Sequence, residues 1–186
     1  MPLPIPAAGR QRVHLRQIFL EGWQREDACW DIEARLVDTK DHDYPLASGL
    51  RLQGEPVHDM WVRVTIDEQM NVVEAAASSD SVPYPGGCDT IAPAYEQLVG
   101  LNLMKGFRRA TLDIFDTVRG CSHLTELVNL LPTAAIQTFA SRMRDTDGHT
   151  PGQKPFQLDQ CHALDTSSET VRRYYPRWFI KQKTGT

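Results

Sequence analysis

The alternation of hydrophobic and polar positions predicts strands in the first half of the chain. In segment 56–67, PVHDMWVRVTID, apolar residues recur at every second position, which is the period of a strand with one buried face. One side of this strand carries Met60, Val62, Val64 and Ile66, and the other side carries Trp61, Arg63 and Thr65. Segments 13–22 and 29–40 are extended in pattern, and segment 70–78 is expected to complete a hairpin. The acidic stretch 38–49 is expected to be a loop.

The second half of the chain has the spacing of helices. Segment 121–145 carries an apolar stripe at intervals of three and four residues, formed by Leu124, Leu127, Val128, Leu131, Ala135 and Phe139. Pro132 is expected to kink this helix or split it in two. Segments 91–106 and 107–118 also favour helix. Strands followed by helices predict an α+β fold, with an antiparallel sheet of three to five strands packed against two or three helices.

Length and composition favour one folded domain. The chain has 186 residues, of which 41% are hydrophobic, and this is enough for one core. Residues 1–12 contain three prolines, and we expect them to form a flexible arm that precedes a single domain of residues 13–186.

Charge and hydropathy narrow the range of partners and locations. The net charge of −4 and the pI of about 5.8 give no basic surface for nucleic acid or for anionic lipid. No apolar run approaches the roughly 20 residues that span a membrane, and the N-terminus lacks the apolar segment of a secretory signal. We therefore expect a cytoplasmic protein, whose cysteines stay reduced and act as core residues, ligands or nucleophiles. The four cysteines are Cys29, Cys88, Cys121 and Cys161.

Two of these cysteines stand where helices are expected to begin. Cys88 follows a pair of glycines, and Cys121 follows Gly120. The N-terminus of a helix favours the thiolate form of a cysteine. Thiolate, imidazole and aspartate oxygen are the usual ligands of zinc in proteins. We therefore expect a mononuclear zinc or iron site, with candidate ligands Cys88, Cys121, His123, His58 and Asp59.

The sequence leaves open whether such a site is catalytic. If one metal position stays open, the metal can polarise a small-molecule substrate or generate hydroxide, with His58 or Asp59 as the base. If the protein fills every position, the metal is structural. The residues also have plainer interpretations, since the cysteines can simply pack in the core and His58–Asp59 or His123 can cap the strand and the helix.

Two further functions remain as alternatives. In a metal-free cysteine enzyme, Cys121 would be the nucleophile, with His123 or His58 as the base and Asp59 orienting it. In a partner-binding module, the aromatic segment RRYYPRWF (172–179) would dock on another protein or on a second copy of the chain in a homo-oligomer. The same segment can instead close the protein's own core. The pattern assigns no role to Cys161 and His162.

Several segments resemble a bacterial family known only as a domain of unknown function. They are PVHDMWVRVTID, PYPGGC, YEQLVGLNL, MKGF, GCSHLTEL and LDQCHAL, of which GCSHLTEL is the most specific. The resemblance covers residues 13–164 approximately and implies no activity.

The order of the parts is also similar to iron–sulfur scaffold proteins of the NifU and IscU type. This similarity implies a NifU/IscU-like core in which Cys88 and Cys121 match the second and third scaffold cysteines and Asp59 matches the scaffold aspartate. The first scaffold cysteine is missing, with His58 nearby, and Gly120 stands where the scaffold often has histidine. The similarity therefore implies a mixed cysteine, histidine and aspartate metal site rather than cluster assembly.

Overall fold

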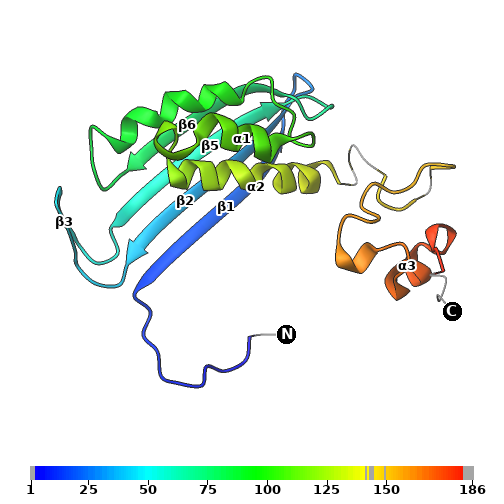
Figure 1. Ribbon diagram of the computed structural model, residues 1–186, viewed down its shortest axis with the longest axis horizontal. Helices are drawn as coiled ribbons and strands as arrows, with labels where there is room; N and C mark the ends of the chain where they lie inside the picture. The colour runs from blue at the N-terminus through cyan, green and yellow to red at the C-terminus, as the bar shows by residue number, and fades with distance from the viewer. Residues whose placement is uncertain (1–2, 141, 143–144, 149, 182–186) are drawn as a thin grey trace. The chain divides into compact units, whose positions relative to one another are not determined.

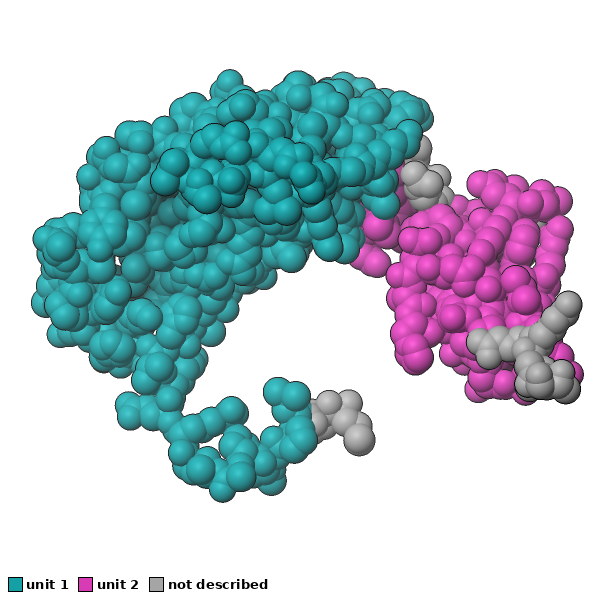
Figure 2. All heavy atoms as spheres, in the orientation of Figure 1, with its two compact units in different colours: residues 1–135 teal, residues 136–186 magenta. Residues whose placement is uncertain are grey.

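The computed structural model describes residues 3–140, 142, 145–148 and 150–181 of the chain (Figure 1). The chain forms two compact units, residues 1–135 and residues 136–186, which Figure 2 colours separately. The α+β fold expected from the sequence is confirmed, because an antiparallel sheet in the first half is followed by helices.

Four long antiparallel strands form the sheet of the first unit. Their order across the sheet is β1-β2-β5-β6, with β1 at one edge. The strands are β1 (His14–Gln24), β2 (Trp30–Lys40), β5 (Pro56–Ile66) and β6 (Val72–Ser81). The hairpin of β5 and β6 is the one that the alternating pattern predicts.

The stretch 38–49 differs from the predicted loop. Residues 38–40 continue β2, and a second, two-stranded sheet follows, formed by β3 (Tyr44–Leu46) and β4 (Gly49–Arg51). The Arg51 guanidinium donates a hydrogen bond of 2.8 Å to the carbonyl of Val82, so this small hairpin is attached to the end of β6. Its strands have three residues each, too few for a periodic pattern to reveal.

The helices lie over one face of the four-stranded sheet (Figure 1), and on this face the two central strands, β2 and β5, are buried. Ile32, Ala34 and Leu36 on β2 lie directly opposite Val64, Val62 and Met60 on β5, and all six are buried. Burying a side chain of this size stabilises the fold by roughly 1.5–3 kcal/mol. The apolar stripe predicted for the long helix is fully buried as well.

The helical layer differs from the sequence prediction in its details. The helix expected over 91–106 is a 3₁₀-helix, η1 (Cys88–Leu98), that starts earlier and ends sooner, and residues 99–106 form turns and isolated bridges. The next helix is α1 (Phe107–Phe115), followed by the short η2 (Thr117–Arg119). The long helix α2 (Ser122–Phe139) runs through Pro132 as one element, so the helix is not split there.

The turn between α1 and α2 has a constrained backbone. Thr117 has φ of +50°, in the left-handed region that a β-branched residue adopts only at a cost. Gly120 packs so closely that a Cβ at this position would lie 2.6 Å from the Cβ of Phe115 and 2.8 Å from its carbonyl oxygen. The turn holds Cys121 directly before the first residue of α2.

Beyond the end of α2, the described residues of the second unit form three short helices, η3 (His162–Leu164), α3 (Glu169–Tyr174) and η4 (Pro176–Trp178). The aromatic segment 172–179 packs partly within this unit, because the Tyr175 hydroxyl donates a 2.9 Å hydrogen bond to the carbonyl of Thr146. Tyr174 in the same segment is exposed. Its docking on a partner stays a prediction.

Candidate functional site

A buried carboxylate lies at the centre of the candidate site. Asp38 follows Leu36 on the inner face of β2, and only 3% of its surface is exposed. A carboxylate in such a position is costly unless hydrogen bonds and opposite charge compensate for the lost hydration. The neighbouring strands supply both.

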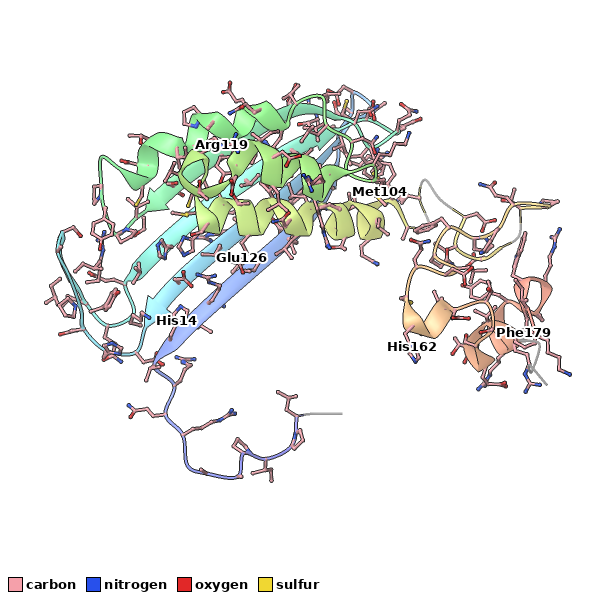
Figure 3. The ribbon with its side chains drawn as sticks, in the orientation of Figure 1. His14, Met104, Arg119, Glu126, His162 and Phe179 are labelled. Carbon is pink, nitrogen blue, oxygen red and sulfur yellow. The ribbon has the colours of Figure 1, made fainter. Side chains whose placement is uncertain are left out.

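Side chains from β1 and β5 hold both oxygens of Asp38. Arg16 and His58 lie directly opposite Asp38 in the strand register. The Arg16 guanidinium donates to Oδ1 and Oδ2 at 2.8 Å each, and the guanidinium also reaches Glu126 on α2 at 2.6 Å. The Nε2 atom of His14 lies 2.9 Å from Oδ1, and the Nδ1 atom of His58 lies 2.9 Å from Oδ2. Figure 3 labels two members of this group, His14 and Glu126.

These contacts keep Asp38 ionised. Burial acts to raise the pKa of Asp38, but the hydrogen bonds from Arg16, His14 and His58 and the charge of Arg16 outweigh it. The pKa of Asp38 therefore lies well below its ordinary value.

His123 brings a third imidazole, after those of His14 and His58, to the same carboxylate. It belongs to the first turn of α2, and its Nε2 atom lies 3.9 Å from Oδ2 of Asp38. The rings of His123 and His58 are stacked, with centroids 3.8 Å apart and a tilt of 31°. Burial, together with the nearby His58 and Arg16, lowers the pKa of His123 to about 4. Burial also lowers the pKa of His58, so both imidazoles are neutral near pH 7.

Asp38, His58 and His123 together form a group that could hold a metal ion. Each offers one ligand atom, and these three atoms all lie within 4.8 Å of one another. The three residues come from β2, β5 and α2, so the fold and not the local sequence brings them together.

A pocket of about 530 Å³ opens beside the two histidines. Both cysteines that the sequence singles out line it, Cys88 at the start of η1 and Cys121 before α2. Its volume is in the range of small-molecule sites. The ionisable groups around Asp38 therefore lie next to a cavity that is large enough for a small ligand.

Cys121 is held by hydrogen bonds of its backbone. Its N–H donates to the Tyr95 hydroxyl at 3.0 Å, and its carbonyl accepts from Tyr95 at 2.9 Å and from the N–H of Thr125 at 2.9 Å. Tyr95 is completely buried and stacks on Phe115. The Sγ atom of Cys121 lies 4.0 Å from Nδ1 of His123.

Four of the five residues singled out from the sequence line this pocket, namely His58, Cys88, Cys121 and His123. Asp59 does not, because neighbouring strand residues point to opposite faces. Asp59 receives two hydrogen bonds from Arg35, of 2.8 and 2.7 Å.

Sequence reasoning missed Asp38, Arg16 and His14. Asp38 continues the inner-facing series of β2, in which Trp30, Ile32, Ala34 and Leu36 are buried. A charged residue on the apolar face of an alternating strand is the signal that identifies it, but the stretch beginning at residue 38 reads as an acidic loop.

Comparison with known proteins identifies the family. Residues 14–137 match the model of DUF2889, described as a protein of unknown function, so the chain belongs to this family. The matched residues include the whole Asp38, His58 and His123 group. No curated protein and no solved structure gives a significant match. The likeness to NifU and IscU proteins therefore stays a prediction.

In the part of the chain that the structure describes, no helix is both long and apolar enough to cross a bilayer.

Proposed function

We propose that this protein binds one zinc or iron ion through Asp38, His58 and His123 and acts as a metal-dependent enzyme. The observation that carries the proposal is the convergence of one carboxylate and two imidazoles, with ligand atoms within 4.8 Å, beside an open pocket. Two histidines and one carboxylate are a recurrent ligand set of catalytic zinc and of non-haem iron.

The distances between the candidate ligand atoms support a shared ion. Bonds of about 2.0–2.2 Å place ligand atoms on one metal about 2.9–3.5 Å apart. Oδ2 of Asp38 lies 2.9 Å from Nδ1 of His58 and 3.9 Å from Nε2 of His123. A rotation of the His123 side chain, which stands at the pocket wall, would close the longer of these two separations.

The charge state of the group also suits a cation. Metal ligands must be deprotonated, and Asp38 is ionised while both imidazoles are neutral at pH 7. The Arg16 cation opposes metal binding, but Glu126 pairs with it at 2.6 Å and offsets its charge. Arg16 and His14 would then orient the carboxylate, as the hydrogen-bond partners of metal ligands do in known sites.

Three protein ligands leave at least one metal position for water or substrate. A zinc or iron ion held there supplies Lewis acidity toward a bound oxygen atom. The residues of this chain hold the ion, fix the orientation of the Asp38 carboxylate and enclose the pocket.

Metal content of untagged protein, measured by mass spectrometry, tests the proposal. We expect about one equivalent of zinc or iron in the wild type, and its loss in Asp38→Asn and in His123→Ala. The matched control is Asp59→Asn, one residue from His58 but on the opposite face of the sheet, which should keep the metal. Circular dichroism checks that each variant is folded. A folded wild type without metal after growth in zinc and iron would overturn the proposal.

Cysteine variants distinguish this ligand set from the one that the sequence alone predicts. Cys88→Ser and Cys121→Ser should keep the metal if Asp38, His58 and His123 bind it. Loss of the metal in both variants would instead support ligation by Cys88 and Cys121 and assign Asp38 the role of a positioning group.

One observation favours a metal-free thiol enzyme as the second candidate. The Sγ atom of Cys121 lies 4.0 Å from His123, at the wall of the same pocket and at the start of a helix. Alkylation by iodoacetamide distinguishes the two functions. A nucleophilic Cys121 reacts rapidly at pH 7 in the wild type and slowly in His123→Ala, with chelator having no effect on either rate.

A further inference from the structure

We infer that the pocket beside Asp38, His58 and His123 binds a small molecule that has an uncharged, mainly apolar body and one polar end at the histidines. The inference rests on the proposed function in one respect, namely that the polar end of the ligand binds the proposed metal ion. The wall of the pocket carries the argument for the apolar body of the ligand.

The wall of the pocket lacks charged side chains. Among the described residues of the chain, no aspartate, glutamate, lysine or arginine lines it. Its apolar members are Met60, Pro83, Tyr84, Ile91 and Val118. A carboxylate, phosphate or ammonium group on the part of the ligand that lies against this wall would lose hydration without gaining a partner of opposite charge. The wall therefore selects against charge on the body of the ligand.

Most of the polar side chains of the pocket come from neighbouring positions in the fold. His58 lies near the start of β5, and Cys121, Ser122 and His123 lie at the beginning of α2, while Cys88 and Thr90 lie on η1. The Ser122 hydroxyl lies 3.5 Å from Nδ1 of His123, so these groups are neighbours. A ligand with one oxygen-bearing end satisfies these groups and places its body against the apolar wall.

Apolar side chains at the rim are unusually exposed. Val118 is 93% exposed and Tyr84 is 50% exposed, although both line the pocket. Exposed apolar groups that border a cavity mark binding surfaces more often than scattered ones do. A bound apolar body would cover part of both side chains and remove this area from water.

The backbone beside Val118 supports the same conclusion. Thr117, with φ of +50°, precedes Val118 directly. A threonine in this conformation is about 1–2 kcal/mol less stable than in the right-handed region. Packing of the next residue, Val118, does not offset this strain, because Val118 is almost fully exposed. Such strain is commonly kept at ligand sites.

Three probe molecules test the contributions of the apolar body and of the polar end to binding separately. Benzohydroxamic acid has an aromatic body and a metal-binding end, acetohydroxamic acid has the same end with a methyl group, and benzyl alcohol has the body without a chelating end. We expect calorimetry on metal-loaded protein to give at least tenfold tighter binding for benzohydroxamic acid than for acetohydroxamic acid, because the pocket buries the ring. Equal affinities would overturn the inference.

Two variants test the wall itself. Ile91→Asp adds a charge to it and should reduce the affinity for benzohydroxamic acid about tenfold with unchanged metal content. Val118→Asp lies at an exposed position that does not threaten folding, and it should lower the affinity in the same direction. The control is Val99→Asp, which is 49% exposed and outside the pocket lining, and which should have no effect.

The metal-free protein separates failure of this inference from failure of the proposed function. If the wild type binds no metal, benzyl alcohol can still be tested by ligand-observed NMR, with benzoate as its charged counterpart. Binding of benzyl alcohol but not of benzoate, lost in Ile91→Asp, supports the apolar pocket and leaves only the metal site overturned. Absence of benzyl alcohol binding, or equal binding of benzoate, overturns the pocket inference.

Discussion

At the scale of single residues, the protonation of His123 links the site to the stability of the fold. Its pKa is lowered to about 4 in the folded protein, while an unfolded chain has a histidine pKa near 6.5. Between these two values the unfolded state binds more protons than the folded state. The free energy of unfolding must therefore fall as the pH is lowered across this window. Asp38 acts at lower pH, because its depressed pKa stabilises the fold until the pH falls through that pKa.

We predict that His123→Gln reduces the pH dependence of stability between pH 6.5 and 4. A single group can contribute at most about 1.4 kcal/mol per pH unit. Denaturant unfolding of metal-free wild type and variant at four values of pH measures the two slopes. Identical slopes would show that His123 is protonated in the folded protein across this range.

The sequence identified part of the site at this scale for a physical reason. His58, Cys88, Cys121 and His123 have reactive side chains next to strand starts, glycines or helix starts, and such signals are local. Asp38 lies 20 residues before His58 in the chain and comes next to it only because β2 and β5 pair. Asp59 was predicted to be a ligand because it directly follows His58. In a strand, however, adjacent side chains point to opposite faces of the sheet.

At the scale of elements, the turn between α1 and α2 positions the pocket. Its backbone brings Gly120 against Phe115, and Phe115 stacks on Tyr95, which in turn holds Cys121. The close approach leaves no space for a side chain at position 120, so the turn depends on glycine there.

We predict that Gly120→Ala destabilises the protein by about 1–3 kcal/mol. The new methyl group would lie 2.6 Å from the Cβ of Phe115 and 2.8 Å from its carbonyl oxygen, so the backbone must move. The matched control is Gly87→Ala, where the nearest atom to the new Cβ is the Tyr84 carbonyl at an ordinary 3.5 Å. Thermal unfolding followed by circular dichroism compares the two, and equal midpoints would contradict this account of the turn.

The elements that the sequence predicted well are those with a clean period and one buried face. Helix α2 and strands β2 and β5 belong to this class. The helix predicted for segment 91–106 is present only to Leu98, because tertiary contacts outweigh the helical spacing of residues 99–106. Gly100 and Gly106 adopt positive φ there, and the Asn102 side chain bonds to the carbonyl of Gln69 and to Asn71 near the β5–β6 turn.

At the scale of the whole molecule, the first unit contains every residue of the candidate site. The family match ends at residue 137, close to the end of α2 at Phe139. The buried faces of the sheet and of the helical layer supply a core within this part of the chain.

We predict that a fragment of residues 1–140 folds cooperatively and binds metal with the stoichiometry of the full chain. Its own sheet and helices provide the buried apolar area that folding requires. Chemical unfolding and metal analysis of the fragment, with its His123→Ala variant as the control, test this. A fragment that shows no cooperative transition would demonstrate that residues 141–186 are needed for the fold of the first unit.

The contacts of Arg16 connect the edge of the sheet to the chemistry of the site. Arg16 stands on the edge strand β1, yet its guanidinium bonds to Asp38 on β2 and to Glu126 on α2. When β1 detaches in a local opening, Asp38 loses its main cationic partner in the same event. Anything that binds the Asp38 group therefore shifts the opening equilibrium of β1, and the exchange rates of its backbone amides report on the site.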